Sequence, residues 1–137
     1  MPHNNCQLWF HIIWTTKNRD AVFTRDLLIH RLGPLLNEIA HEKGIDLQFT
    51  NGYKEHIHCL VKLSSTQNIA TVVKNLKAIS AKRINDQKWF DFIFSWQVGY
   101  SAFSVSPNRV PVAINYIKNQ WEKHQKMDFS TEIQNMS

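Results

Sequence analysis

Two histidines stand one residue apart in the stretch KEHIHCLVKL, residues 54–63. Successive side chains of a strand point to opposite faces, so His56 and His58 are predicted to project from the same face. Two neighbouring imidazoles can bind a divalent metal ion if at least one further ligand comes from elsewhere in the chain. Two hydrogen-bonded surface histidines would give the same pattern. The opposite face is predicted to be buried and carries Tyr53, Ile57, Cys59, Val61 and Leu63.

A candidate third ligand lies in the later stretch NYIKNQWEKH. Tyr116 and Gln120 are four residues apart, so they share one face of a predicted helix. Two imidazoles and the hard amide oxygen of Gln120 leave positions for phosphate oxygens and water, which suits Mg²⁺ or Mn²⁺ better than a structural zinc ion. Tyr116 is either a nucleophile or an amphipathic residue at a helix–sheet boundary. His11 and His124 are expected near this site, but neither is assigned as a ligand.

The apolar pattern predicts seven elements in the order β-α-β-β-α-β-α. The first six have the order of a ferredoxin-like split βαβ fold, an α+β architecture with helices mainly on one face of an antiparallel sheet. The other face is open unless a partner or an extra helix covers it, and the two histidines are expected there. A final helix carries Tyr116. The predicted strands are 7–16, 45–50, 53–63 and 89–105, with a break near Gly99, and the predicted helices are 24–44, 64–85 and one that starts within 106–112 and runs to 125.

Local signals mark the ends of several elements. Thr24 is a predicted N-cap, and Gly44 is a predicted C-terminal stop of the first helix. The Gly-Pro pair at 33–34 predicts a kink or a restart inside that helix. The Asn-Gly pair at 51–52 is a strong hairpin signal and predicts the turn into the histidine strand.

The composition is that of one basic domain. The 137-residue chain has a net charge of +5 and a pI near 9.4, which favours polyanionic partners. We expect a single domain over residues 1–127 and a flexible tail over 128–137. No apolar run approaches the roughly 20 residues of a membrane span, and the N-terminus lacks a signal-peptide pattern. The expectation is a cytoplasmic, nucleoid-associated protein with reduced Cys6 and Cys59.

These motifs together resemble the HUH single-tyrosine transposases of the IS200/IS605 type. The similarity covers most of the chain and depends on the order and spacing of several motifs, none of which would suffice alone. The stretches that carry it are IIWTTKNR at 12–19, YKEHIHCLVKL at 53–63, KAISAKRIN at 77–85, WQVGYSAFSVS at 96–106 and YIKNQWEKH at 116–124.

The resemblance implies a reaction and a site. It implies that Tyr116 attacks a DNA phosphodiester while His56, His58 and Gln120 hold Mg²⁺ or Mn²⁺. The products would be a 5′-phosphotyrosine and a free 3′-OH that can later rejoin the strands. The substrate implied is single-stranded or hairpin DNA. Candidate phosphate contacts, each of which is otherwise a solvated surface charge, are Lys17, Arg19, Lys54, Lys74, Lys77, Lys82 and Arg83.

The resemblance also implies a homodimer in which the tyrosine helix of one subunit completes the site of the other. The long apolar segment 89–105, or the strand edges, are expected to join the two copies.

Other functions remain open from the residues alone. The chain could be a non-catalytic nucleic-acid-binding module, because RNA-recognition domains use the same fold. It could be a hydrolase in which a metal-activated water attacks, although its best candidate base, Glu55, is predicted on the face opposite the histidines. A domesticated relative that keeps the DNA-processing site is a third alternative.

Overall fold

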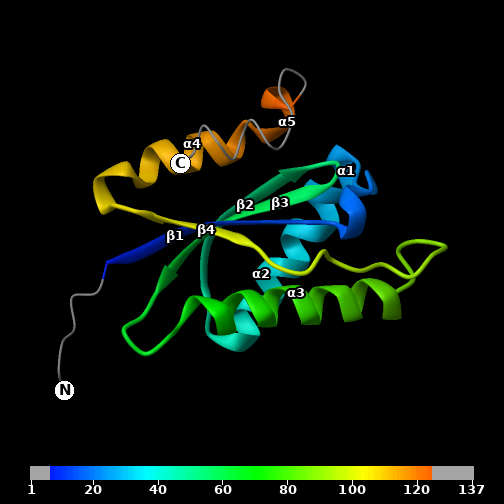
Figure 1. The fold of residues 1–137 in the computed structure, drawn as a ribbon, viewed down its shortest axis with the longest axis horizontal. Coiled ribbons are helices and arrows are strands. Elements are labelled where there is room, and N and C mark those ends of the chain that lie inside the picture. Colours follow the sequence, from blue (N-terminus) through cyan, green and yellow to red (C-terminus); the bar gives the residue numbers. More distant parts are fainter. Residues whose placement is uncertain (1–6, 125–137) are drawn as a thin grey trace.

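The computed structural model describes residues 7–124, and it contains a four-stranded antiparallel sheet (Figure 1). The expected boundary between residues 127 and 128, and Cys6, lie outside this range. The strands are β1 (Leu8–Thr15), β2 (Asp46–Tyr53), β3 (His56–Leu63) and β4 (Ser101–Val105), in the spatial order β2-β3-β1-β4. This order is that of a ferredoxin-like sheet, so the predicted fold class is confirmed.

The helices divide between the two faces of the sheet (Figure 1). One face is covered by α2 (Gly33–Lys43) and α3 (Ile69–Asp86), and the main apolar core lies between them and the strands. The other face lies beneath α4 (Val110–Lys118) and α5 (Gln120–Lys123), which contact β2 and β3. Short helical turns are α1 (Arg25–Leu27), η1 (Lys17–Arg19), η2 (Leu28–Leu32) and η3 (Pro107–Arg109).

The first predicted helix consists of three consecutive segments, α1, η2 and α2, and its hydrogen bonding changes from α-helical to π-helical before Pro34. Thr24 caps it, as predicted, by accepting a hydrogen bond from the Leu27 N–H at 3.1 Å. Pro34 has no N–H and would clash with the carbonyl four residues earlier, and the wider π-helical turn of η2 precedes it. The helix restarts at Gly33 and ends at Gly44, whose left-handed φ of 66° is the predicted stop.

The predicted hairpin turn is wrong by three residues. β2 continues through Asn51 and Gly52 to Tyr53, and the chain turns at residues 54–55 instead. Gly52 pairs with Ile57 inside the ladder, where a Cβ would collide with the carbonyl oxygen of His56. The glycine is therefore needed for close approach of two strands rather than for a turn. Tyr53 pairs with His56 and so lies on the histidine face, not on the opposite face as predicted.

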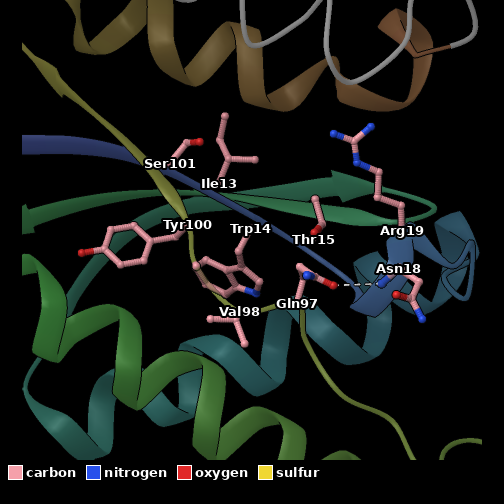
Figure 2. A pocket seen from close by; sticks show the side chains of 10 residues that line it. Ile13, Trp14, Thr15, Asn18, Arg19, Gln97, Val98, Tyr100 and Ser101 are labelled. Atoms are coloured by element: carbon pink, nitrogen blue, oxygen red, sulfur yellow. Dashed lines mark hydrogen bonds between the residues drawn. The ribbon is translucent and has the colours of Figure 1, made fainter.

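The predicted long strand over 89–105 is also wrong for most of its length. Only residues 101–105 form β4, and a single bridge joins Trp96 to Thr16. The segment is apolar because Phe94 and Trp96 enter the core from an irregular connection. Next to Trp96, the Gln97 side-chain oxygen accepts a hydrogen bond from the Asn18 N–H at 3.0 Å (Figure 2).

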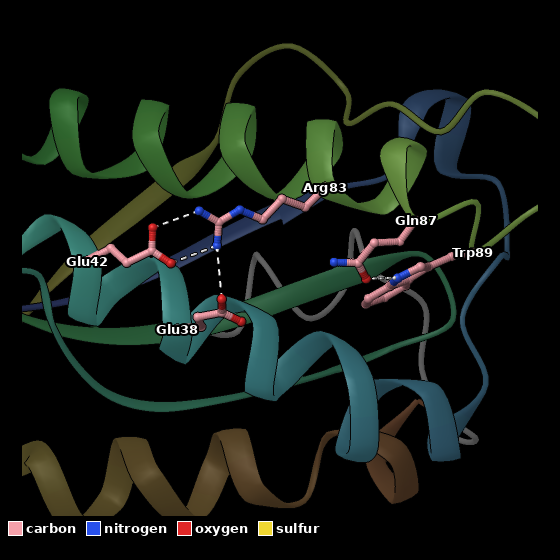
Figure 3. Close-up of polar contacts among 5 residues, drawn as sticks. All are labelled: Glu38, Glu42, Arg83, Gln87 and Trp89. Carbon is pink, nitrogen blue, oxygen red and sulfur yellow. Dashed lines mark hydrogen bonds and ion pairs between the residues drawn. The ribbon is translucent and has the colours of Figure 1, made fainter.

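An ion-pair cluster joins α2 to α3 on the outer side of the core (Figure 3). The Arg83 guanidinium donates to both carboxylate oxygens of Glu42, at 2.7 and 2.9 Å, and to Glu38 at 3.4 Å. The hydrogen bonds from Arg83 hold the pKa of Glu42 below its ordinary value of 4.5. This two-pronged geometry is the stronger form of an exposed ion pair.

We expect Glu42→Gln to lower stability only where Glu42 is ionised. Because the folded-state pKa is lowered, the carboxylate stabilises the fold above the unfolded value near 4.5, and this contribution is lost as pH falls through the folded value. The urea midpoint of Glu42→Gln should therefore be lower than that of the unsubstituted chain at pH 7, and the two should converge in acid. Asp91→Asn, at an exposed site on the 89–100 segment, is the control. A gap that is the same at both pH values would contradict this account.

Candidate active site

The two histidines of β3 lie side by side and are fully buried. Both imidazoles point to the face covered by α4 and α5, as strand parity predicts, and each has an exposed fraction of 0%. Thr15 of β1 and Tyr53 of β2 flank His56, whereas Ile13 and Asn51 flank His58. Both histidines therefore stand on one central strand, paired on both sides, rather than on a loop, which fixes the positions of both rings.

The δ nitrogen of each imidazole has its own polar partner. The Glu55 carboxylate lies 2.7 Å from His56 Nδ1, and the Nε2 atom of His11 lies 2.7 Å from His58 Nδ1. A carboxylate can only accept, so His56 Nδ1 carries the proton and His56 Nε2 keeps its lone pair. When His58 Nδ1 likewise donates to His11, both ε nitrogens have the form that a metal ligand needs. Glu55 was expected on the opposite face, but it lies in the turn at 54–55, where the alternation of side chains in a strand does not apply.

The C-terminal helices bring two more candidate ligands to these rings. Gln120 is fully buried, and its side-chain oxygen lies 3.5 Å from His56 Nε2. The Gln120 amide group donates to the Tyr116 carbonyl at 3.1 Å, which turns the oxygen toward the histidines. His124 lies edge-on to His56, with 4.4 Å between ring centroids.

His56, His58 and His124 form a buried cluster that could hold a metal ion. One nitrogen from each of the three lies within 4.8 Å of the others. Tyr116, Gln120 and His124 recur at intervals of four, so the spacing that pointed to Gln120 also contained His124. His124 was expected near the site but was not assigned as a ligand, and the structure places it within the cluster.

Tyr116 stands at the edge of this cluster. Its ring centroid is 5.9 Å from that of His11 and 6.0 Å from that of His58. The half-buried phenol also lines a cavity of about 310 Å³ with Phe103 and Arg109. The Lys123 ammonium lies 4.7 Å from the centre of the Tyr116 ring. The phenol is therefore next to the histidines and open to a cavity in which a phosphate could lie.

Three contacts fix the tyrosine helix over the sheet. The Asn51 amide donates to the carbonyl oxygens of Ile117 and Lys118, at 3.2 and 3.1 Å, at the end of α4. Arg25 and Glu122 form an ion pair of 2.8 Å between α1 and α5. Ile117 is fully buried beneath the helix. In this chain Tyr116 thus lies over its own histidines.

The family model for IS200-like transposases matches residues 4–120. The chain belongs to this family. The resemblance drawn from the motifs is therefore confirmed, and the protein is a transposase-family, DNA-processing enzyme.

Related proteins agree with this placement. The ISDra2 transposase TnpA of Deinococcus radiodurans is 28% identical over 124 residues, which cover 85% of this chain and 86% of that protein. A crystal structure of a candidate transposase from Deinococcus radiodurans R1 is 25% identical, covers 88% of this chain and 96% of that one, and has a TM-score of 0.69. A REP-associated tyrosine transposase bound to a REP hairpin shares the fold, with a TM-score of 0.58, 13% identity, and coverage of 87% of this chain and 68% of that one.

The seven predicted DNA contacts of this IS200-like transposase fall into two groups. Lys17 and Arg19 follow β1, and Lys54 lies in the β2–β3 turn. These two segments are neighbours, because the Thr16 N–H donates to the Glu55 carbonyl at 2.8 Å. These three lie at the histidine end of the sheet.

The other four predicted DNA contacts lie on α3, across the sheet from the histidines. Lys74 is exposed, and Lys82 pairs with Asp86 at 2.8 Å. Arg83 belongs to the Glu42 cluster, and the Lys77 ammonium donates to the carbonyl oxygens of residues 97 and 99, each at 2.7 Å.

Two further observations concern the Cys59 thiol and the helices of this transposase. Burial raises the pKa of the Cys59 thiol to about 12, so Cys59 stays protonated and is not a nucleophile at neutral pH. Between residues 7 and 124, none of the helices has both the length and the apolar character required to cross a membrane.

Proposed function

We propose that this transposase cleaves and rejoins single-stranded DNA, including the strand at the foot of a hairpin, through a 5′-phosphotyrosine at Tyr116. The observation that carries the proposal is the position of the Tyr116 ring, which lines an open cavity and whose centroid lies 5.9 Å from that of His11 and 6.0 Å from that of His58. This placement supports a reaction in which the Tyr116 phenol and a metal ion held by the histidine cluster act on one phosphate. The reaction would take place in the cytoplasm, on chromosomal DNA.

The proposed chemistry is a balanced exchange of phosphodiesters. The Tyr116 oxygen attacks the phosphorus, the bond to the 3′ oxygen breaks, the phenol proton passes to solvent and the departing 3′ oxygen takes up a proton. The phosphotyrosine conserves the energy of the broken bond, so a 3′-OH can later reverse the step without a nucleotide cofactor. Glu55 does not serve the rival hydrolase reaction well, because its carboxylate is already engaged with His56 Nδ1.

The ligand set fits a divalent metal ion. His56, His58 and Gln120 would hold Mg²⁺ or Mn²⁺, and His124 is positioned to join them. When bound, such an ion polarises the phosphate and offsets the negative charge of the transition state. A third imidazole shifts the preference from Mg²⁺ toward Mn²⁺, because Mg²⁺ favours oxygen ligands and water.

The phosphate contacts are proposed to centre on Lys17, Arg19 and Lys54. These three flank the histidine end of the sheet, whereas Lys74, Lys77, Lys82 and Arg83 would reach only DNA that continues around the edge toward α3. A domesticated relative would use the same contacts, since they position the strand and do not depend on mobility.

Tyr116→Phe is expected to abolish a covalent DNA adduct while leaving DNA affinity within about twofold, because phosphate contacts come from Lys and Arg. The measurement is a denaturing gel of the protein with the hairpin DNA that flanks its gene and Mn²⁺, beside a binding titration of the same DNA. His58→Ala should also lose the adduct. A Tyr116→Phe protein that still cleaves would assign the reaction to water, and an unsubstituted protein that binds but forms no adduct would assign the chain to non-catalytic binding.

His124→Ala is expected to weaken Mn²⁺ binding by about tenfold or more and Mg²⁺ binding by less. The reason is the loss of an imidazole ligand from a site whose remaining oxygen ligands suit Mg²⁺. Isothermal titration with each ion gives both affinities without any DNA. His41→Ala, at an exposed histidine of α2, is the matched control. If Gln120→Ala weakens Mn²⁺ binding and His124→Ala does not, the ligand set is the one predicted from sequence alone.

We also propose a homodimer. In the single chain Tyr116 lies over its own histidines, so completion of the sites in trans would require the two copies to exchange α4 and α5. Ile93 and Val98 of the 89–100 segment are 84% and 94% exposed, and β4 is an edge strand, so apolar and hydrogen-bonding surface is available to a second copy.

A mixture of Tyr116→Phe and His58→Ala proteins tests this arrangement. Equal mixing gives heterodimers in which one site combines an intact tyrosine with intact histidines, so adduct formation should return to about a quarter of the unsubstituted level. Each variant alone is the control. A mixture as inactive as its components would show that Tyr116 serves the histidines of its own chain.

A further inference from the structure

A second cavity lies beside the active site, and of its lining residues only Arg19 is among the proposed phosphate contacts (Figure 2). Its volume is about 470 Å³, within the roughly 300–1,000 Å³ of small-ligand sites. The end of β1 and the segment that leads into β4 form its walls. The lining residues that matter here are Ile13, Thr15, Arg19, Gln97, Tyr100 and Ser101.

The second cavity and the cavity beside Tyr116 lie one after the other along the same face of β1 and β4. His11 and Phe103, which are paired across β1 and β4, line the Tyr116 cavity. The next pair on the same face of the same two strands is Ile13 and Ser101, and it lines the second cavity. Ile13 is also the strand neighbour of His58. A polymer that lies along β1 and β4 would therefore pass from one cavity to the other.

The wall of the second cavity is held in place from two sides. The Lys77 ammonium donates to the carbonyl oxygens of Gln97 and Gly99, each at 2.7 Å, and burial lowers its pKa. On the other side, Asn18 and Arg19 have φ angles of 58° and 55°, a left-handed conformation that residues other than glycine rarely adopt. The Asn18 N–H is tied to the Gln97 side chain. Such strained and doubly fixed backbone suits a binding site whose shape must exist before its ligand arrives.

The lining groups match an unpaired base with its phosphate. Tyr100 offers an aromatic ring with an exposed fraction of 42%. The amide of Gln97 and the hydroxyl groups of Thr15 and Ser101 can form hydrogen bonds with the edges of a base. In Figure 2 the Arg19 guanidinium reaches toward the side of the sheet on which α4 and α5 lie, where the proposed phosphate would be.

We propose that this cavity binds one unpaired base of the strand whose phosphate lies at Tyr116, with Tyr100 as a stacking surface. The choice of DNA as the polymer rests on the proposed function, whereas the cavity and its position along β1 and β4 do not. Lys77 is then a positioning residue that holds the cavity wall, and not the phosphate contact that its charge predicted.

Two probes separate base binding from phosphate binding. One is the 20-nucleotide oligomer of thymidine, and the other is an abasic oligomer of the same length, which keeps every phosphate and lacks every base. Affinities are measured by fluorescence anisotropy with Mn²⁺ present and with Tyr116→Phe as the background, so that no cleavage occurs. The ratio of the two affinities reports base contacts alone.

Tyr100→Ala is expected to lower this ratio by about tenfold, the effect of one lost stacking contact, with the abasic affinity unchanged. Phe92→Ala, at an exposed aromatic residue of the same segment outside the cavity, should leave the ratio as it was. Lys77→Met should lower the ratio as Tyr100→Ala does, because it removes the hydrogen bonds that hold the carbonyl groups of Gln97 and Gly99 in the cavity wall. Circular dichroism melting of each variant confirms that it is folded.

The proposal is overturned if Tyr100→Ala leaves the ratio unchanged or lowers both affinities equally. The positioning role of Lys77 is overturned if Lys77→Met weakens both probes equally, the behaviour of a phosphate contact. Because no cleavage enters the measurement, failure of the phosphotyrosine reaction would appear in the adduct assay and leave this ratio unaffected.

Discussion

The burial of two adjacent imidazoles is the constraint on which the rest of the site depends. A buried polar group without a partner costs about 1–3 kcal/mol, and His56 and His58 each carry two ring nitrogens into a region with an exposed fraction of 0%. The fold meets this constraint with Glu55 and His11 on the δ nitrogens. Gln120 and His124 approach from the helices above. One nitrogen from each of His56, His58 and His124 lies within 4.8 Å of the others, so the arrangement that buries the rings also gathers candidate metal ligands.

The helices that bury the imidazoles also position Tyr116, the proposed nucleophile. Asn51 fixes the end of α4, and Gly52 lets β2 and β3 approach beside His56. Tyr53 then stacks against His124, with 4.9 Å between ring centroids. Three consecutive residues of β2 thus hold the tyrosine helix, the strand pairing and the additional imidazole. The position of Tyr116 therefore depends on an edge strand that carries none of the proposed catalytic or metal-binding residues.

The features that follow from the periodicity of a strand or a helix were predictable from the sequence. The close approach of Gly52 to a neighbouring backbone and the irregular 89–100 segment were not. Alternation placed His56 and His58 on one face, and helical spacing placed Gln120 with Tyr116, because both patterns follow from local geometry. The Asn-Gly pair suggested a turn, since nothing local shows that Gly52 faces a neighbouring backbone. The apolar residues of 89–100 suggested a strand, but Phe94 and Trp96 are core residues on an irregular connection. The engagement of Lys77 and Arg83 by carbonyl and carboxylate groups depends on distant segments that a single sequence does not place together.

The most direct measurement of this account is the position of a bound metal ion. Crystals of the protein soaked in Mn²⁺ give an anomalous difference map in which the ion is identified without reference to activity. We expect one principal peak about 2.0–2.3 Å from nitrogens of His56 and His58, with His124 or Gln120 completing the ligand set. Peaks confined to exposed histidines such as His30 and His41, with no density between His56 and His58, would contradict it.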